Sequence, residues 1–278
     1  MKKKITILSI SFITLSCLCL PTKSQVIPDN TLDAENSTIN STVINEVPSE
    51  RIDGGAIRGT NLFHSFEAFN VNEGSGVYFS NPAVIENIIS RVTGNNPSEI
   101  LGTLGVLGNA NLFLINPNGI IFGSNASLDV NGSFIGSSSS SVIYDGFEFA
   151  ANNNPQAPPL LTINVPIGLG FGDNPGTIVN QSIVATEEDL IGLRVAPQQT
   201  LALVGGDISI SGGFLTVEGG RIELGSVAGN SQVALIPGET GWKLSYEDVK
   251  SFQDISVSGS AFIANAGKTD DIQLQAET

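Results

Sequence analysis

Residues 200–227 read TLALVGG DISISGG FLTVEGG RIELGSV when the sequence is cut every seven residues. The second and fourth residues of each unit are aliphatic, and the residue between them is small or polar. This two-residue period is that of a β-strand with one buried face. Pairs of glycines end the first three units. A helical heptad places its apolar residues three and four apart and would not tolerate such pairs, so the repeat predicts short strands and excludes a coiled coil.

The turns between these strands carry no Asn-Gly or Asp-Gly signal of a two-residue hairpin, so we expect them to be the corners of a solenoid. About three units, roughly twenty residues, would close one rung of a parallel β-helix. The apolar pair of each unit would point inward and stack on its counterpart one rung along. Each buried side chain would contribute about 1.5–3 kcal/mol. Similar but less regular patterns occur at 128–134, 161–165, 255–260 and 271–274. A β-sandwich with tight turns is the alternative that the pattern leaves open.

The composition also favours an all-β protein. The chain has 31 glycines, and its charged residues, 14% of the total, are too few for the exposed faces of several amphipathic helices. The run AANNNPQAPPL at 150–160 is predicted to be a loop outside the strand ladder, because proline does not fit inside one. The five serines at 137–141 are predicted to form an exposed edge or turn.

The segment 1–24 has the features of a secretory signal peptide. Three lysines precede an apolar run from Ile5 to Leu20, and the small residues Thr22 and Ser24 stand at positions −3 and −1 of a cleavage site. A membrane anchor would need about 20 apolar residues and would not be followed by a processing site. A lipoprotein signal at Cys17 or Cys19 is disfavoured, because neither has a leucine-like residue three positions before it.

The predicted mature chain, residues 25–278, forms one domain and contains no cysteine. Such a chain is suited to staying unfolded in an oxidising periplasm and threading a narrow pore, although many exported proteins are simply poor in cysteine. Removing the leader with its four lysines takes the formal net charge from −15 to −19. This charge repels nucleic acid and anionic lipid, so we expect no nucleic-acid partner.

A tight corner is predicted in the stretch ANLFLINPNGIIFG, residues 110–123. Pro117 presets φ for the second position of a turn, while Asn118 and Gly119 tolerate the positive φ that such a turn requires. The apolar runs on either side predict that the turn joins two buried strands. It would then be a corner of the solenoid.

Three stretches resemble the N-terminal secretion domain of filamentous-haemagglutinin-like exoproteins (TpsA) of the two-partner secretion pathway. They are NLFHSFEAFNV at 61–71, the segment 77–123, and GGRIELGSVAG at 219–229. Asn81 and Pro82 are the nearest counterpart of the family's upstream NPNL-type motif. The family's NPNGI motif coincides with Asn116, Pro117, Asn118, Gly119 and Ile120.

The resemblance implies a right-handed parallel β-helix with an N-terminal cap and loops outside the coil. It also implies export by the general secretory route and recognition of the unfolded domain by the periplasmic POTRA modules of an outer-membrane TpsB-type β-barrel transporter. The residues of both motifs would belong to the region that the transporter recognises. The product would be secreted, or held at the outer cell surface as an adhesin-like module, and would meet the membrane only during export.

The last unit, DIQLQAET at 271–278, resembles a rung abandoned partway. An uncapped β-helix end leaves backbone groups unpaired. We therefore expect the chain to be truncated before an adhesive shaft, or to be the product of a split gene.

Two other functions are compatible with a β-helix. The protein could be a polysaccharide-active enzyme or a stand-alone adhesin with a glycan target. The enzyme would need carboxylates on adjacent rungs, whereas the acidic residues here are scattered. Glu218, Arg221 and Glu223 are close in sequence, but such a set beside a turn is predicted to be a solvated ion pair. Trp242 and three tyrosines are the aromatic residues, besides phenylalanine, that a glycan groove could use.

His64 is the only histidine of the chain, and it lies among Phe63, Phe66 and Phe69. A packed structural role is predicted for it. The three phenylalanines step by three residues, which fits either a helical turn or an irregular cap, with core packing as their role. The sequence thus predicts a protein that is not an enzyme and that has no catalytic residue, no metal site and no cofactor.

Overall fold

The computed structural model describes residues 26–152, 154–160, 165–186, 189–239, 241–266 and 271–277. The predicted signal peptide lies outside these residues, as do the first four residues of the predicted strand at 161–165. The helical structure of the described part is a single 3-10 turn, η1 (Asp33–Glu35). No helix of this part is long and apolar enough to cross a membrane.

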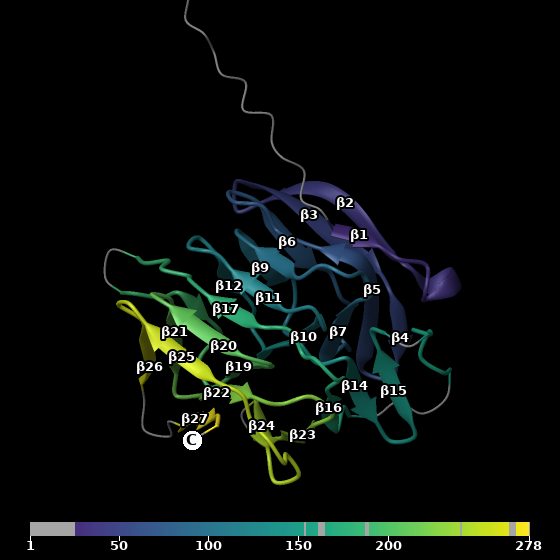
Figure 1. Cartoon of the computed structure of the whole chain (residues 1–278). Helices are drawn as coiled ribbons and strands as arrows, with labels where there is room; N and C mark the ends of the chain where they lie inside the picture. Colours follow the sequence, from purple (N-terminus) through teal and green to yellow (C-terminus); the bar gives the residue numbers. More distant parts are fainter. Residues whose placement is uncertain are drawn as a thin grey trace, which may run out of the picture.

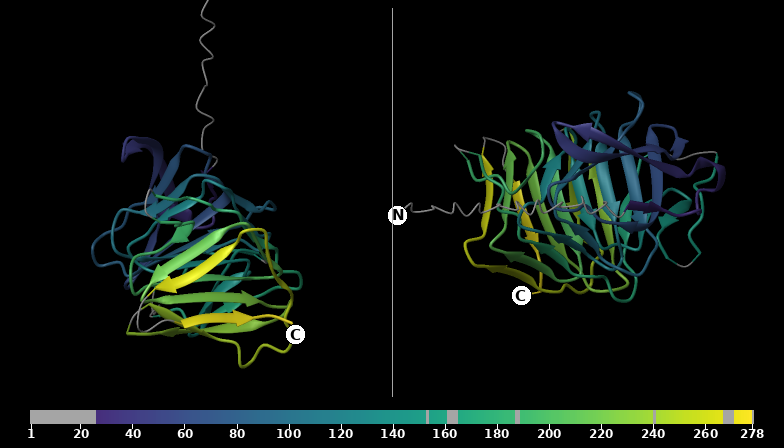
Figure 2. Two further views of the ribbon diagram at one scale, coloured as in Figure 1. Left: turned by 90° about the vertical axis from the view of Figure 1, so that its left-hand side faces the viewer. Right: turned by 90° about the horizontal axis from the view of Figure 1, so that it is seen from above.

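The chain coils around one axis, so that strands of successive rungs lie side by side and in parallel on three faces (Figures 1 and 2). The long face contains β5 (Asn61–Phe69), β7 (Asn87–Val92), β10 (Asn111–Ile115), β13 (Phe134–Ser137), β19 (Thr200–Gly205), β22 (Arg221–Ser226) and β27 (Asp271–Gln275). The second face contains β8 (Ser98–Ile100), β11 (Ile120–Phe122), β17 (Ile178–Asn180), β20 (Ile208–Ser211) and β25 (Ile255–Ser258).

The third face consists of two sheets. The first contains β3 (Val47–Gly54), β6 (Gly76–Phe79), β9 (Thr103–Val106) and β12 (Ser127–Asp129). The second contains β18 (Leu193–Arg194), β21 (Phe214–Glu218) and β26 (Phe262–Ala266). Along the chain each rung passes from the long face to the second face and then to the third. Right-handed winding, which the resemblance implies, is also the sense that parallel strands with crossover connections adopt as a rule.

The seven-residue repeat describes one rung of this coil. Its first three units form β19, β20 and β21 on the three faces, and its fourth forms β22, back on the long face. Leu201 accordingly pairs with Ile222, its counterpart three units further along, and Leu112 pairs with Phe134 in the same way. The predicted parallel β-helix, with about three units to a rung and stacking from rung to rung, is confirmed. The β-sandwich alternative is wrong.

The interior of the coil is a stack of apolar side chains. On the long face one such ladder passes through six rungs without a polar residue, and none of its members is more than 1% exposed: Leu62, Ile88, Leu112, Phe134, Leu201 and Ile222. Each rung adds one more buried side chain to the ladder, worth about 1.5–3 kcal/mol. Stability therefore builds up from contacts between neighbouring rungs.

A second, antiparallel sheet lies outside the coil. It contains β14 (Ser141–Tyr144), β15 (Phe147–Ala150) and β16 (Gly168–Gly170), which leave the coil after β13, and β23 (Gln232–Pro237) and β24 (Trp242–Ser245), which leave it after β22. Its strands lie in the order β15-β14-β16-β23-β24. A separate apolar cluster joins this sheet to the outer side of the long face, where Phe113, Ala202 and Val204 are fully buried. The long face is thus covered on both sides.

This second layer overturns two predictions. The alternation of TLALVGG predicted one buried face, but Leu201, Ala202, Leu203 and Val204 are all fully buried because the outer sheet covers the second face of β19. The serines at 137–141 are not an exposed edge, because four of them are at most 3% exposed. They lie where the chain passes from the coil into the outer sheet, and Ser137 Oγ donates to the Val204 carbonyl at 2.6 Å.

The predicted loop at 150–160 does lie outside the ladder, since its described residues form no strand beyond Ala150, the last residue of β15. It is nevertheless attached to the N-terminal part of the domain. The guanidinium Nε of Arg58 donates to the carbonyls of Pro158 and Pro159, at 3.1 and 2.9 Å.

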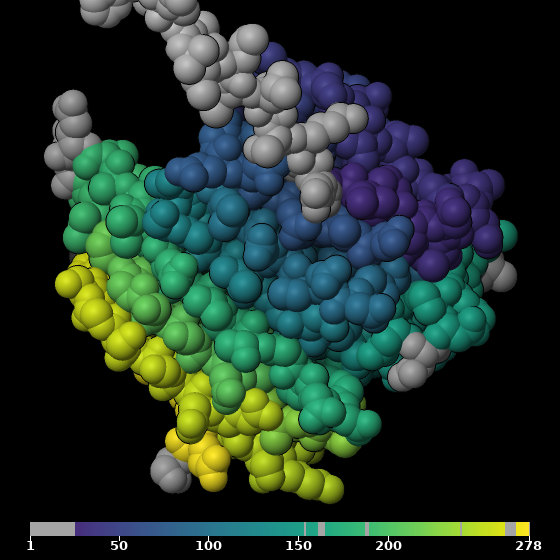
Figure 3. Space-filling view, turned by 45° about the horizontal axis from the view of Figure 1, so that its top comes forward, coloured from purple at the N-terminus to yellow at the C-terminus, as the bar shows by residue number. Residues whose placement is uncertain are grey.

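The N-terminal residues form the predicted cap. Strands β1 (Val26–Pro28) and β4 (Ala56–Arg58) pair antiparallel with β5, and β2 (Ser37–Ile44) forms a hairpin with β3. The cap and the last strands lie at opposite ends of the molecule, drawn in purple and yellow in Figure 3. At the yellow end the last rung is uncovered, and Val257, Phe262, Ile272 and Leu274 are 44–52% exposed. Truncation before a longer shaft stays a prediction.

A buried arginine joins the cap, the coil and the outer sheet. The Arg91 guanidinium is fully buried and donates to Ser65 Oγ at 2.9 Å, to Thr31 Oγ1 at 2.7 Å and to the Ala150 carbonyl at 2.8 Å. It also lies 3.9 Å from the centre of the Phe149 ring. Burial lowers the pKa of Arg91 to about 10.

Asp29 of the cap supplies negative charge to the same network. Its carboxylate accepts hydrogen bonds from Thr93 at 2.6 Å, from Ser65 at 2.7 Å and from Thr31 at 2.7 Å. Burial alone would raise the pKa of Asp29, but these hydrogen bonds outweigh it and lower the pKa. The first residues of the domain are therefore fixed to the first two rungs by a satisfied polar network.

Candidate functional site

The Asn116–Gly119 segment is the corner between β10 on the long face and β11 on the second face. The Gly119 N–H donates to the Asn116 carbonyl at 2.9 Å, which closes a four-residue turn. Gly119 has φ +109°, a backbone conformation that an L side chain rarely adopts. The structure thus places these residues at the solenoid corner that the sequence predicted.

Asn116 fixes the corner from inside. Its side chain is fully buried, and Nδ2 donates to the Asn96 carbonyl and to Ser98 Oγ, both at 3.0 Å. Its Oδ1 accepts from the backbone N–H of Asn118 at 3.0 Å. One amide therefore holds its own turn and ties it to the corner of the preceding rung.

The following rung closes over the other side of the turn. The Gly176 N–H donates to the Pro117 carbonyl at 2.9 Å, and the Ile120 N–H donates to the Thr177 carbonyl at 3.2 Å. A Cβ on Gly119 would lie 2.3 Å from that Thr177 oxygen. A residue with a side chain does not fit here unless the backbone moves.

The motif is mostly hidden once the protein has folded. Asn116, Gly119 and Ile120 are buried, Pro117 is half-buried, and Asn118 is exposed. The Asn118 side chain lies along the surface, where Nδ2 donates to the Gly94 carbonyl at 2.8 Å. All five residues of the motif are therefore accessible together only in the unfolded chain.

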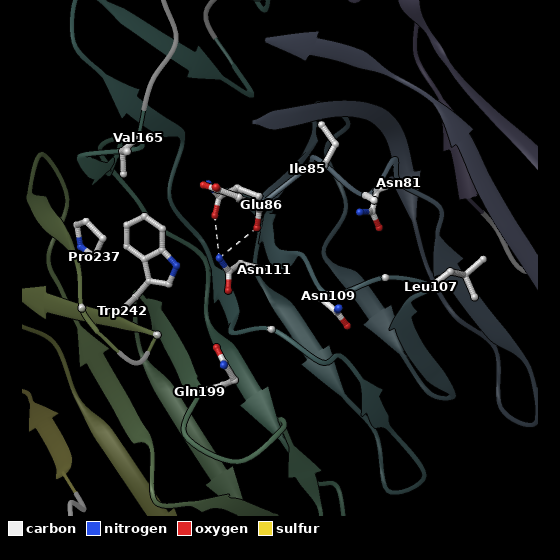
Figure 4. Close-up of a pocket in the computed structure, with 16 residues that line it drawn as sticks. Asn81, Ile85, Glu86, Leu107, Asn109, Asn111, Val165, Gln199, Pro237 and Trp242 are labelled. Atoms are coloured by element: carbon white, nitrogen blue, oxygen red, sulfur yellow. Dashed lines mark hydrogen bonds between the residues drawn. The ribbon is translucent and has the colours of Figure 1, made fainter. Parts of the chain in front are cut away.

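Asn81 and Pro82 lie at a different corner, between β6 on the third face and β7 on the long face. The Asn81 Nδ2 donates to the Pro82 carbonyl at 3.0 Å, and Asn81 lines a groove (Figure 4). This corner precedes the strands of the long face, whereas the Asn116–Gly119 corner follows them. The structure does not bring the two predicted recognition segments together.

His64 is a structural residue, as predicted. It is fully buried in β5, its Nδ1 lies 2.9 Å from Ser37 Oγ, and its ring packs against Phe66 and Phe79. Burial lowers the pKa of His64 to about 3, so the ring is neutral in the folded state. The neighbouring phenylalanines belong to a strand and not to a helical turn, and they are core residues.

The prediction of a solvated ion pair was wrong for Glu223. This residue is fully buried under the outer sheet, 3.2 Å from Arg221, and it accepts a hydrogen bond from the Leu244 N–H at 3.4 Å. Burial raises the pKa of Glu223 to about 7. Glu218 instead pairs with Arg194 at 3.7 Å on the surface.

Within the described residues, no three His, Cys, Asp or Glu side chains lie close enough together to hold a metal ion.

The sequence reasoning missed a ladder of asparagines at the start of the long-face strands. Asn61, Asn87 and Asn111 occupy the same position in three successive rungs. The Asn87 Nδ2 donates to Asn61 Oδ1 at 3.2 Å, and the Asn111 Nδ2 donates to Asn87 Oδ1 at 2.9 Å. The signal was present in the sequence, because each of these residues precedes two large apolar ones, in NLF, NII and NLF.

The fold and its corners define a class of protein, a capped parallel β-helix built from short rungs with an antiparallel sheet on its outer side. Comparison with known proteins supplies the family. The chain belongs to the TPS secretion domain family, whose model matches residues 24–274, and the predicted two-partner-secretion family is thereby confirmed. No curated protein matches the sequence.

Two solved structures are similar to this one. The HMW1 secretion domain from Haemophilus influenzae matches with a TM-score of 0.51 and 21% sequence identity, over 86% of this chain. This chain spans only 55% of that one. The filamentous hemagglutinin secretion domain matches with a TM-score of 0.38 and 16% identity, over 89% of this chain and 96% of that one. The HMW1 match supports the β-helical fold, and none of the comparisons supports the enzyme alternative.

Proposed function

We propose that this chain is the secretion module of an exoprotein and is recognised, before it folds, by the POTRA modules of an outer-membrane TpsB-type transporter. The proposal rests mainly on the burial of residues 116–120 in the folded protein. Asn116, Gly119 and Ile120 are buried between neighbouring rungs, so a partner can contact these residues only in the unfolded chain. After passage the chain folds outside the cell and is secreted or stays at the cell surface.

Two further features support folding after passage. Both cysteines, Cys17 and Cys19, lie in the predicted signal peptide, so no disulfide cross-links the chain that follows. The rungs are also local units, since each long-face strand pairs with the strand of the next rung, as Leu62 does with Ile88 and Leu201 with Ile222. A coil of this kind can grow rung by rung as the chain emerges, starting from the N-terminal cap.

The experiment is the export of the tagged chain from a Gram-negative host, with and without its nearest co-encoded outer-membrane barrel. We expect release into the medium only when the barrel is present. Release without the barrel, or retention in the periplasm in both cases, would contradict the proposal.

Variants separate recognition from folding. Asn118→Ala removes an exposed side chain from the motif and should lower release while the refolded protein loses only about 1 kcal/mol of stability. Asn131→Ala is the matched control, because Asn131 is an exposed asparagine at another corner that also donates to a backbone carbonyl, that of Gly108. If both variants are released like the unaltered chain, the motif has no recognition role.

A further inference from the structure

A groove of about 700 Å³ runs along the corner between the third face and the long face (Figure 4). One wall is formed by the corner turns, with Asn81, Asn109 and Gln199. The other is formed by the outer sheet, with Pro237 and Trp242. We call it the corner groove, and its volume lies within the range of sites for small ligands.

The floor of the corner groove is rigid and polar. It includes Asn87 and Asn111 of the asparagine ladder. The ladder continues to Ser133, whose N–H donates to Asn111 Oδ1 at 2.9 Å and whose Oγ donates to Gln199 Oε1 at 3.0 Å. Because these groups satisfy one another, they hold the surrounding side chains in fixed positions.

Several polar groups of the walls remain without a partner among the described residues. The Asn81 Oδ1 is buried and accepts no hydrogen bond. Asn109 and Gln199 use their amide oxygens as acceptors, which leaves their NH₂ groups available as donors. Trp242 bonds to Thr200 through its backbone only, and Figure 4 shows its indole nitrogen turned toward the groove. The corner groove therefore presents several hydrogen-bond donors, whereas the Asn81 oxygen lies beneath its surface.

Charge and apolar surface narrow the choice of ligand. Among the described residues that line the groove, Glu86 is the only charged one, and these residues include no cation to attract an anionic ligand. Leu107 and Val165 are 49% and 42% exposed and provide apolar contact surface beside the amides. This mixture suits a molecule that carries hydroxyl groups next to C–H surfaces.

An added peptide strand fits the groove less well. It would need a free row of backbone N–H and C=O groups. The long-face strands β7 and β10 are each paired on both sides. On β24, the backbone of Trp242 is bonded to the Thr200 hydroxyl at 2.7 and 2.8 Å, and the Leu244 N–H is bonded to Glu223. The backbone edges near the groove are therefore occupied.

We propose that the corner groove binds a neutral oligosaccharide. Hydroxyl oxygens accept hydrogen bonds, so they can bond to the free NH₂ groups of Asn109 and Gln199. The C–H face of a sugar ring can pack against the exposed apolar side chains. This binding belongs to the folded protein and goes beyond the proposed export function, so either can fail without the other.

The test uses Trp242, the single tryptophan of the chain, as the reporter. The folded protein is titrated with maltohexaose, cellohexaose and N-acetylchitohexaose to about 10 mM while tryptophan emission is recorded. Calorimetry on the same samples detects binding that leaves the emission unchanged. We expect saturable binding of at least one of these sugars and none of an anionic hexamer such as oligogalacturonate.

Two variants locate the site. Asn109→Ala and Gln199→Ala should each weaken binding about three- to tenfold, the effect of one lost hydrogen bond. Asn125→Ala is the control, because Asn125 is an exposed asparagine at a different corner, where it bonds to Glu73. The proposal is overturned if no neutral sugar binds, if the two groove variants bind like the control, or if only the anionic hexamer or an extended peptide binds.

Discussion

The substitution Gly119→Val tests most directly whether the Asn116–Gly119 corner is packed between neighbouring rungs. Gly119 has φ +109°, and a Cβ at this position would lie 2.3 Å from the backbone oxygen of Thr177. That oxygen cannot move away easily, because it accepts the hydrogen bond from Ile120 that joins the two rungs. The variant therefore suffers both a strained backbone and a clash with backbone.

The two effects can be estimated separately. A residue held in a sparsely populated backbone region costs about 1–3 kcal/mol. Forcing extra atoms into a packed site costs about 1–3 kcal/mol more. A total loss of about 2–6 kcal/mol is large compared with the roughly 5–15 kcal/mol that stabilises a typical domain. For a domain of this size the loss corresponds to a fall in Tm of roughly 4–24 °C.

The assay is urea unfolding of the purified, refolded chain, which measures folding independently of export. Gly74→Val is the matched control, because Gly74 also has positive φ (+69°) but has nothing within 4 Å of an added Cβ. We expect this control to lose only the backbone part, about 1–3 kcal/mol. If Gly119→Val loses no more stability than Gly74→Val, the reasoning that the corner is packed between rungs is refuted.

Three further predictions concern buried titratable side chains. Arg91→Met should lower the free energy of unfolding by about 3–5 kcal/mol, since it leaves the Ala150 carbonyl and the Ser65 and Thr31 hydroxyls without their buried donor. Arg51→Met, in an exposed pair, should cost at most about 1 kcal/mol, and equal losses in urea unfolding would contradict this. His64 has a pKa of about 3 in the folded protein, against an ordinary value of 6.5. The protein therefore loses stability as the pH falls from 6.5 toward 3, by up to about 4–5 kcal/mol. The substitution His64→Gln should flatten this slope in unfolding curves measured across that pH range. Glu223 has the opposite pH dependence: its pKa is raised to about 7, so the protein loses stability as the pH rises from 4.5 through 7. The variant Glu223→Gln should therefore be more stable than the unaltered chain at pH 8, by about 1–3 kcal/mol. It should lose that advantage near pH 4.

The sequence by itself determined the coil and its corners. The repeat at 200–227 specifies one rung because all the signals that define it lie within one short stretch of sequence. These signals are the alternation of the strands, the paired glycines of the turns, and the pairing partners Leu201 and Ile222. The turn at Asn116–Gly119 could be predicted for the same reason, since proline, asparagine and glycine fix its backbone through their own chemistry. The link to two-partner secretion also came from short motifs.

Only the tertiary structure decided what covers the coil. The outer sheet joins β16 to β23. These strands are separated in the sequence by β17 to β22, about two rungs of the coil, and no local pattern encodes their pairing. That sheet covers the carboxyl of Glu223 and the region where four of the serines at 137–141 are buried, and it forms one wall of the corner groove. The periodicity of a strand shows which side chains share a face, but whether the outer face meets water or a second layer depends on distant segments. The burial of those side chains could therefore be read only from the folded molecule.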